Sequence, residues 1–420
     1  MSEPDPTTVF ESEDLRATLH RAGGGSRPLV ITFDSLNFEL GLDRPGFGQD
    51  WLSDVGYDAV HVVSRRNIWY QYREMGELFG RLREQAAKHP RAVTYGSSMG
   101  GYAAIRFAGR VGADTAIAIS PQFSIAPARA AFDDRWREHA HAIEFLWDEP
   151  TEEDRLLETA WVFFDPHDAD RLHVDALAEH FPVRRLPLPY AGHPAGAYLA
   201  ESGQLATSVL AMIEGVFDPE VFQRGVRGAR RSSGQYHFTV AQRQPRRRLR
   251  TALRLAQEAA RLAPLSAPYT SLNARLLEDA GRLEEAEELH RRALQLEPRH
   301  YKFHLDLALL LRTGRSSEAA DLVRNLRGLD VDSAAAHQKA CMILFRTGNY
   351  EDALVAARAA LARAPGSRRT RSWVQALAVL LGTPIVGRGV LGLASRASER
   401  PASPFRKWLF QSDSRASRLS

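Results

Sequence analysis

The turn Gly96-Ser97-Ser98-Met99-Gly100 has the residue types of a nucleophilic site. An apolar, β-prone run at 92–95 precedes it, and a helix of small residues follows it from 101 onward. A serine in a sharp strand-to-helix turn needs glycine two positions away on either side, because larger side chains would keep the strand and the helix apart. This spacing predicts Ser98 as a nucleophile. A glycine-rich turn with an inactive serine is the alternative.

A serine hydroxyl reacts well when an imidazole accepts its proton and a carboxylate orients that imidazole. Apolar runs at 158–164 and 183–188 are predicted strands, and each is followed by side chains of the required kind. The first leads into the acid-bearing segment 165–170, and the second leads into Gly192-His193. Because ligands bind beyond the carboxyl ends of parallel strands, these side chains are expected to meet Ser98 at one edge of a sheet.

His193 is the predicted base among 14 histidines because it follows the last predicted strand. His61 and His173 fall on predicted strand and helix faces and are interpreted as structural residues. His167 would have to act from the acid-bearing segment, which makes it a weaker candidate than His193.

The elements that must position these residues alternate between strands and helices. Predicted strands cover 28–33, 57–63, 92–95, 115–119, 158–164 and 183–188, and predicted helices include 75–88, 102–109 and 171–180. This alternation predicts an α/β fold with a parallel, doubly wound sheet.

Residues from about Arg27 to Ile213 resemble a compact α/β-hydrolase that lacks the two leading antiparallel strands of larger members. The resemblance rests on the GSSMG turn, the acid-bearing segment after the penultimate strand and the Gly192-His193 turn after the last. It implies a serine hydrolase of the esterase type that forms an acyl-enzyme with a small ester or acylated substrate. Acyltransferases and inactive members share this fold, so the fold does not choose among them.

The resemblance also assigns the acid of the site. It is expected at Asp168, with Asp170 second and Asp165 third, because the family's acid lies a few residues past its strand. An aspartate in this segment could instead cap the helix that starts near residue 170.

By the same resemblance, backbone N–H groups form an oxyanion hole. One donor is expected at Met99, directly after the nucleophile. The other is expected after the first predicted strand, at Ser35 or Leu36.

The loop Trp69-Tyr70-Gln71 follows the second predicted strand and is a candidate for substrate binding. Tyr70 and Gln71 could hydrogen-bond a polar substrate, and Trp69 could stack on a sugar or an acyl group. An aromatic plug that packs the loop is the alternative. The charged, Trp-containing segment 128–155 is helical in composition and lies where these folds carry a lid.

A second pattern begins beyond residue 217, where the β-type runs stop. Alanines recur at a nearly fixed period, from Ala252 to Ala286 (34 residues), to Ala319 (33) and to Ala353 (34), with glycine and proline at matched positions. The period resembles that of tetratricopeptide repeats, in which small residues allow close helix packing. Such repeats imply a protein or peptide partner, or a scaffold for the enzyme.

Composition limits the remaining possibilities. A chain of 420 residues, 44% hydrophobic and 25% charged, is expected to form two soluble domains. Cys341 is the only cysteine, which excludes an internal disulfide and a thiolate metal cluster, and no metal or cofactor motif occurs. No run resembles a secretory signal or a membrane span, so a cytoplasmic protein is expected.

The net charge of +4 is unevenly placed, because the segment 221–257 contains many arginines and no acidic residue. We interpret this segment mainly as a solvated linker rather than a patch for an anionic partner, and expect no nucleic-acid partner.

The predicted domains are an α/β-hydrolase-like domain (1–216), a basic linker (217–245), tetratricopeptide-like helical repeats (246–382) and a basic tail (383–420). The predicted function is hydrolysis of a small acylated substrate, with the repeats binding a protein partner. The alternatives are an acyltransferase or deacetylase acting on a sugar or glycan, and a non-catalytic protein-interaction scaffold.

Overall fold

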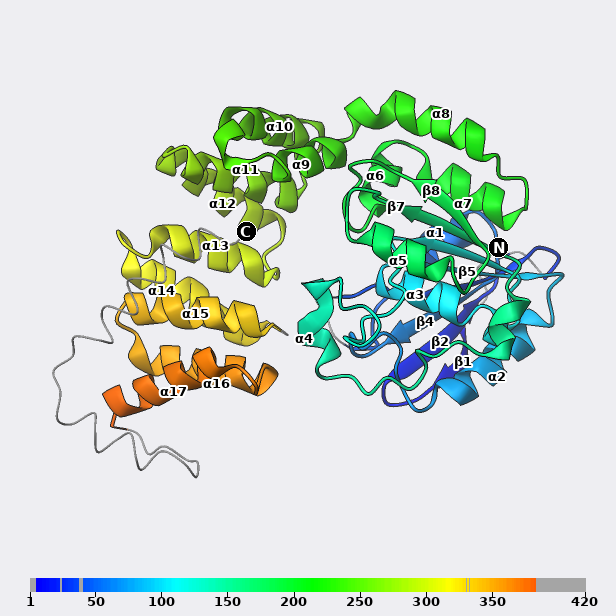
Figure 1. Cartoon of the computed structure of the whole chain (residues 1–420), viewed down its shortest axis with the longest axis horizontal. Helices are drawn as coiled ribbons and strands as arrows, with labels where there is room; N and C mark the ends of the chain where they lie inside the picture. The colour runs from blue at the N-terminus through cyan, green and yellow to red at the C-terminus, as the bar shows by residue number, and fades with distance from the viewer. Residues whose placement is uncertain (1–4, 23–24, 38–40, 330, 332, 383–420) are drawn as a thin grey trace.

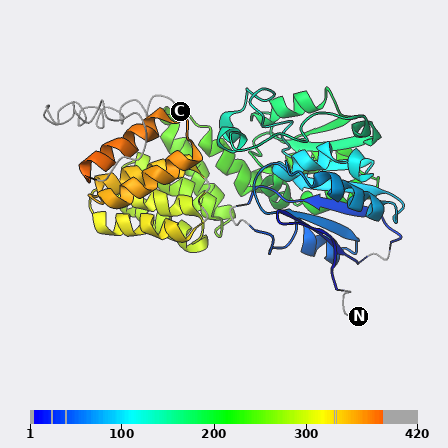
Figure 2. The same ribbon diagram turned by 90° about the horizontal axis from the view of Figure 1, so that it is seen from below.

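The computed structural model describes residues 5–22, 25–37, 41–329, 331 and 333–382. Within these residues the chain forms a sheet-containing half and an all-helical half, which lie side by side in two perpendicular views (Figures 1 and 2). The predicted basic tail, 383–420, lies outside the described residues.

An eight-stranded sheet forms the centre of the first half. Its strands are β1 (Thr7–Glu11), β2 (Leu15–His20), β3 (Leu29–Phe33), β4 (Ala59–Ser64), β5 (Ala92–Ser97), β6 (Thr115–Ile119), β7 (Thr159–Phe164) and β8 (Val183–Pro187). They lie in the order β1-β2-β4-β3-β5-β6-β7-β8, with β2 antiparallel to β1 and β4 and all other neighbours parallel. All six predicted strands occur, and the sheet is mixed rather than wholly parallel.

Strands β1 and β2 correct the sequence interpretation, which took the two leading antiparallel strands to be missing. β2 alternates strictly, with Leu15, Ala17 and Leu19 buried at every second position. This period of two is typical of a half-buried strand. The sequence interpretation did not use this alternation, although it is present in the residues of β2.

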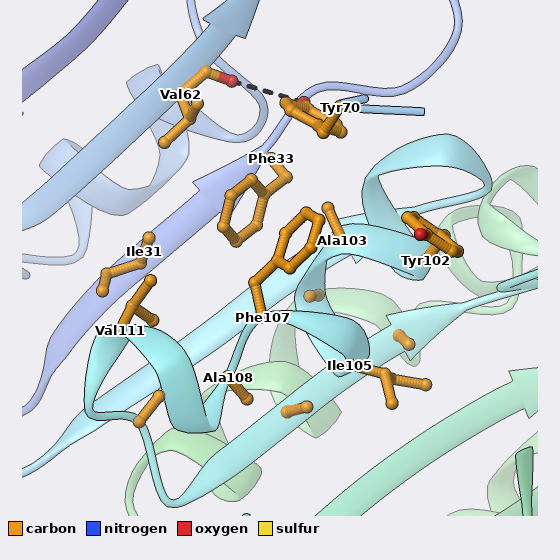
Figure 3. Close-up of a cluster of buried hydrophobic side chains, with 14 of the residues drawn as sticks. Ile31, Phe33, Val62, Tyr70, Tyr102, Ala103, Ile105, Phe107, Ala108 and Val111 are labelled. Carbon is orange, nitrogen blue, oxygen red and sulfur yellow. Dashed lines mark hydrogen bonds between the residues drawn. The ribbon is translucent and has the colours of Figure 1, made fainter. Parts of the chain in front are cut away.

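Helices cover both faces of the sheet. One face carries α2 (Met75–Ala86), α3 (Met99–Arg106) and α5 (Asp170–Leu177), and the other carries α1 (Gln49–Asp54), α6 (Gly196–Glu201), α7 (Leu205–Ile213) and α8 (Pro219–Ala229). Figure 3 shows part of the first core, where Phe33 of β3 meets Phe107 at the end of α3. Helices cover both faces of β5, so the residues that β5 contributes to a site lie at its carboxyl end, at the edge of the sheet.

Helix pairs build the second half. They are α9 (Gly234–Gln242) with α10 (Leu249–Leu262), α11 (Ala267–Asp279) with α12 (Leu283–Leu296), α13 (Tyr301–Leu311) with α14 (Ser316–Arg324), and α15 (Ala334–Arg346) with α16 (Tyr350–Arg363), followed by α17 (Arg368–Leu380). The recurring alanines Ala252, Ala286, Ala319 and Ala353 are all buried in the second helix of a pair. The predicted helical repeat is therefore confirmed.

The predicted basic linker, 217–245, is wrong. Phe222 and Val226 of α8 pack into the core of the sheet half, and α9 is the first helix of the first pair. These two apolar residues are four positions apart, which is a helical spacing. The run of arginines without acidic residues hid this signal, and the repeat half begins at α9 rather than at residue 246.

Candidate active site

Ser98 lies in the turn between β5 and α3, with a φ of 51° and a ψ of −115°. Residues other than glycine rarely adopt this backbone conformation. A Cβ on Gly100 would lie 2.1 Å from the Phe33 carbonyl oxygen, and one on Gly96 would lie 2.3 Å from the Gly100 carbonyl oxygen. Only glycine at these two positions lets α3 pass so closely over the sheet. The turn thereby holds the Ser98 hydroxyl at the carboxyl edge.

Ser98, His193 and Asp170 form a continuous hydrogen-bonded chain. The Ser98 hydroxyl oxygen lies 2.9 Å from Nε2 of His193, and Nδ1 of His193 lies 2.9 Å from both carboxylate oxygens of Asp170. An ionised carboxylate only accepts hydrogen bonds, so Nδ1 carries the ring proton and Nε2 can accept the proton of the serine. The imidazole is 11% exposed and the carboxylate 0% exposed. This arrangement can activate a serine.

The structure reverses the predicted order of the acids. Asp168, the first choice, pairs with Arg135 at 2.8 Å and with Arg243 at 3.2 Å, whereas Asp170 contacts His193. Asp170 is the first residue of α5, and its side chain projects from the first helical turn toward the base. Asp165, the third choice, binds backbone N–H groups elsewhere in the site.

Arg135 is a cationic partner of Asp170 that the sequence analysis did not select. Its guanidinium lies 2.8 Å from the Asp170 carboxylate and also pairs with Asp133. Burial alone would raise the pKa of Asp170, but hydrogen bonds and charge from His193 and Arg135 outweigh burial and hold that pKa below its usual value. Asp170 therefore stays ionised and can stabilise a protonated His193.

Gln122 also contacts the serine. Its side chain is buried, with Nε2 3.3 Å from the Ser98 hydroxyl oxygen and Oε1 3.0 Å from the indole nitrogen of Trp69. An indole N–H can only donate, so Trp69 fixes which end of the amide faces the serine. The Gln122 amide donates to the Ser98 hydroxyl oxygen, so the hydroxyl hydrogen remains free to point to His193. The position of Gln122 just after the predicted strand 115–119 was the available signal.

The predicted oxyanion donors lie around the same turn. Met99 is the first residue of α3, where a backbone N–H has no intrahelical partner. Ser35 follows β3, and its hydroxyl donates to the Ser97 carbonyl at 2.9 Å, which holds this loop beside the turn. In the described part of the chain, the backbone N–H groups of Ser35 and Leu36 make no hydrogen bond. The predicted role in an oxyanion hole needs N–H groups of this kind.

The predicted substrate-binding loop is buried. Trp69 and Tyr70 are 0% exposed and Gln71 is 5% exposed. The Tyr70 hydroxyl donates to a backbone carbonyl at the end of β3, and the side-chain oxygen of Gln71 accepts the N–H groups of Leu146 and Trp147. These contacts correspond to the aromatic-plug alternative and contradict direct substrate binding by Tyr70 and Gln71. Trp69 is linked to the serine through the side chain of Gln122.

The segment 128–155 covers the site. It was expected to be helical, but its helices are the short η2 (Asp134–Trp136), α4 (Arg137–Ala140) and η3 (Glu152–Leu156). The Trp136 ring packs edge-on against the rings of His193, at 5.4 Å between centroids, and of Trp69, at 5.3 Å. Ser98 is 5% exposed beneath this cover. Access to the serine therefore depends on the segment 128–155.

Among the residues that the structure describes, no group of three or more His, Cys, Asp or Glu side chains could hold a metal ion. None of the described helices combines the length and the apolar character needed to cross a membrane.

Similarity to known proteins is found only among solved structures. No protein-family model matches the chain, and no curated protein matches it. TTC0263, described as a thermophilic TPR protein in Thermus thermophilus, is 18% identical, with 43% of this chain and 99% of that one covered at a TM-score of 0.32. YrrB, described as a TPR protein with an unusual peptide-binding site, is 16% identical, with 42% and 89% covered at a TM-score of 0.30.

MamA from Desulfovibrio magneticus RS-1 is 17% identical, with 36% of this chain and 85% of that one covered at a TM-score of 0.31. TM-scores this low establish no shared fold, so the helical repeat rests on the chain's own helix pairs and buried alanines.

Proposed function

We propose that the chain is an esterase-like serine hydrolase of the α/β-hydrolase type, which acts through an acyl-enzyme on a small ester or other acylated substrate. The observation that carries the proposal is the hydrogen-bonded chain from Ser98 through His193 to Asp170. The strained turn at Ser98 and the mixed eight-stranded sheet with two leading antiparallel strands support the same assignment.

In the proposed reaction, Nε2 of His193 accepts the proton of Ser98 while the serine oxygen attacks the acyl carbon. The N–H of Met99, with one from the loop after β3, stabilises the tetrahedral oxyanion. His193 then gives its proton to the leaving group, and the acyl group remains on Ser98. A water molecule that transfers a proton to His193 attacks this ester, and His193 returns that proton to the Ser98 oxygen as the acid leaves. Asp170 stabilises the imidazolium in both steps.

The helical repeat favours a second role, in which the chain binds a protein or peptide partner. The stacked pairs from α9 to α17 are the observation that favours it, because such arrays present an extended surface built from repeated units. This role is compatible with hydrolysis, and a non-catalytic scaffold would retain it alone. The sugar or glycan alternative relied on the loop Trp69-Tyr70-Gln71, and the burial of that loop removes its support.

Covalent labelling by a fluorophosphonate probe tests the hydrolase proposal. We expect the purified wild-type chain to be labelled and Ser98→Ala to remain unlabelled. Labelling of His193→Ala should be slower by on the order of 10³-fold, because the serine then lacks its base. The readout is the rate of probe attachment by mass spectrometry.

Ser97→Ala is the matched control, because it removes the neighbouring hydroxyl at the end of β5 and leaves the chain of Ser98, His193 and Asp170 intact. It should be labelled at the wild-type rate. Equal labelling of Ser98→Ala and the wild type would contradict the proposal. A wild-type chain that the probe does not label would favour the scaffold.

A further inference from the structure

The first helix of the repeat half packs directly against the loop that carries His193. Gln235 of α9 donates from Nε2 to the carbonyl oxygen of Ala191 at 2.9 Å. Gly192 has a φ of 74°, and a Cβ on it would lie 2.9 Å from Thr239 Oγ1 and 3.0 Å from Gln235 Nε2. Helix α9 therefore forms one wall against which this loop is shaped.

Asp165 ties the same loop to the acid-bearing segment. Its carboxylate is 0% exposed and accepts the backbone N–H groups of Tyr190 at 3.1 Å, Gly192 at 3.0 Å and His167 at 2.9 Å. Two of these donors lie just before His193 in the chain. The orientation of the Asp165 carboxylate thus sets the position of the loop.

Arg243 compensates the buried charge of Asp165. It is the C-cap residue directly after α9, and its Nη2 lies 2.8 Å from the Asp165 carboxylate and 3.2 Å from that of Asp168. A buried carboxylate that loses its cationic partner is strongly destabilised, because backbone N–H groups alone do not balance a full charge. The cation that stabilises this arrangement therefore comes from the repeat half.

Glu201 of α6 also fixes α9. Its carboxylate accepts hydrogen bonds from the Ser233 hydroxyl, the Gln235 backbone N–H and the Tyr269 hydroxyl, each at 2.7 Å. Ser233 caps α9, and Tyr269 belongs to α11. The first two helix pairs are therefore anchored to residues of the sheet half that lie before and after His193 in the chain.

We propose that Arg243 is a positioning residue for His193, so that the repeat half is part of the support of the reactive centre. This inference rests on the proposed hydrolase function. Without the guanidinium, the Asp165 carboxylate turns toward water and releases the N–H groups of Tyr190 and Gly192. The loop relaxes, and the 2.9 Å contact between Ser98 and His193 lengthens. A displacement of about 1 Å can lower a rate about 10²-fold.

Arg243→Ala and Arg243→Lys in the full chain test this inference, with Arg224→Ala as the matched control. Arg224 is a surface residue of α8 that pairs with Glu220. The assay is hydrolysis of 4-nitrophenyl acetate, expressed per reactive serine titrated with the fluorophosphonate probe. We expect kcat of Arg243→Ala to fall about 10²-fold while KM stays within about twofold.

The kcat of Arg243→Lys should be at least about tenfold higher than that of Arg243→Ala, because an ammonium restores the charge without the planar fork of the guanidinium. Arg224→Ala should match the wild type. A variant that merely unfolds loses titratable serines but keeps kcat per serine, so this split separates positioning from instability. Gln235→Met, which removes the bond to the Ala191 carbonyl, should change kcat in the same direction and serves if Arg243→Ala does not fold.

Amide hydrogen exchange across residues 186–195 gives a readout that does not depend on turnover. Exchange should be faster in Arg243→Ala than in the wild type and in Arg224→Ala. The positioning role is overturned if the probe labels the wild-type chain but Arg243→Ala keeps both the wild-type kcat per serine and the wild-type exchange rate. A wild-type chain that the probe does not label refutes the proposed function instead, which is a distinct result.

Discussion

Asp168 and Asp170 are two positions apart and have entirely different partners. Helix α5 begins at Asp170, so this side chain leaves the first helical turn toward His193, while Asp168 lies in the preceding loop between Arg135 and Arg243. The sequence could place the acid within 165–170 because the segment follows a strand. It could not choose the residue, because the choice depends on where the helix begins and on two arginines from distant segments.

Asp170→Asn is expected to lower kcat by on the order of 10⁴-fold, because an amide facing Nδ1 of His193 disturbs the tautomer and no longer stabilises the imidazolium. Asp168→Asn is the matched control and should lose less than about tenfold, since it changes only partly exposed ion pairs. Steady-state hydrolysis of 4-nitrophenyl acetate measures both. Similar losses in the two variants would contradict the assignment of Asp170.

At the scale of elements, the sequence predicted the strands that are buried on both faces and the helix pairs that repeat. It missed β1, β2 and α9 because charged residues dominate their surroundings, and short amphipathic elements are recognised less readily than continuous apolar runs. It overestimated helix in the segment 128–155, where contacts such as that of Trp136 with His193 replace regular backbone hydrogen bonding. Such tertiary contacts have no periodic signature.

The turn between β5 and α3 requires glycine at position 100, which a substitution can test. Gly100→Ala should lower the free energy of unfolding by about 1–3 kcal/mol, because the new Cβ would meet the Phe33 carbonyl oxygen at 2.1 Å. Probe labelling of Ser98 should fall with it. Gly80→Ala in α2 is the control: nothing lies within 4 Å of its new Cβ, and alanine should stabilise the helix by about 0.5–1 kcal/mol. Urea unfolding followed by tryptophan fluorescence distinguishes the two outcomes.

At the scale of the whole molecule, the two halves meet through buried polar contacts rather than through a flexible connection. The sequence placed their boundary within a linker because Arg243 and its neighbours form a basic run. Only the folded chain brings Arg243 to Asp165, 78 positions earlier. Pairing of this kind depends on the relative placement of two domains, which local patterns do not encode.

Stability of the sheet half should also depend on pH through Asp34. Burial raises the pKa of Asp34 to about 6 from 3.8, against the opposing effect of the Arg44 guanidinium at 2.8 Å. Between these two pKa values the unfolded chain is ionised and the folded chain is protonated, so stability falls as pH rises from 4 to 6 and then levels off. The loss between pH 4 and pH 7 amounts to about 2 kcal/mol.

Asp34→Asn removes this titration. The free energy of unfolding of the wild type minus that of Asp34→Asn should therefore decrease by about 2 kcal/mol between pH 4 and pH 7. Urea unfolding at several pH values measures the difference. A difference that is constant over this range would show that Asp34 has an ordinary pKa in the folded chain.

Helix α9 belongs both to the repeat stack and to the wall behind His193. The stack can consequently gain or lose units only at its distal end, near α17, without exposing the loop that carries His193. A transplanted array would have to reproduce Gln235 of α9 and Arg243 at its C-terminal end before the sheet half could use it. The two halves are thus not interchangeable modules, even though each has a core of its own.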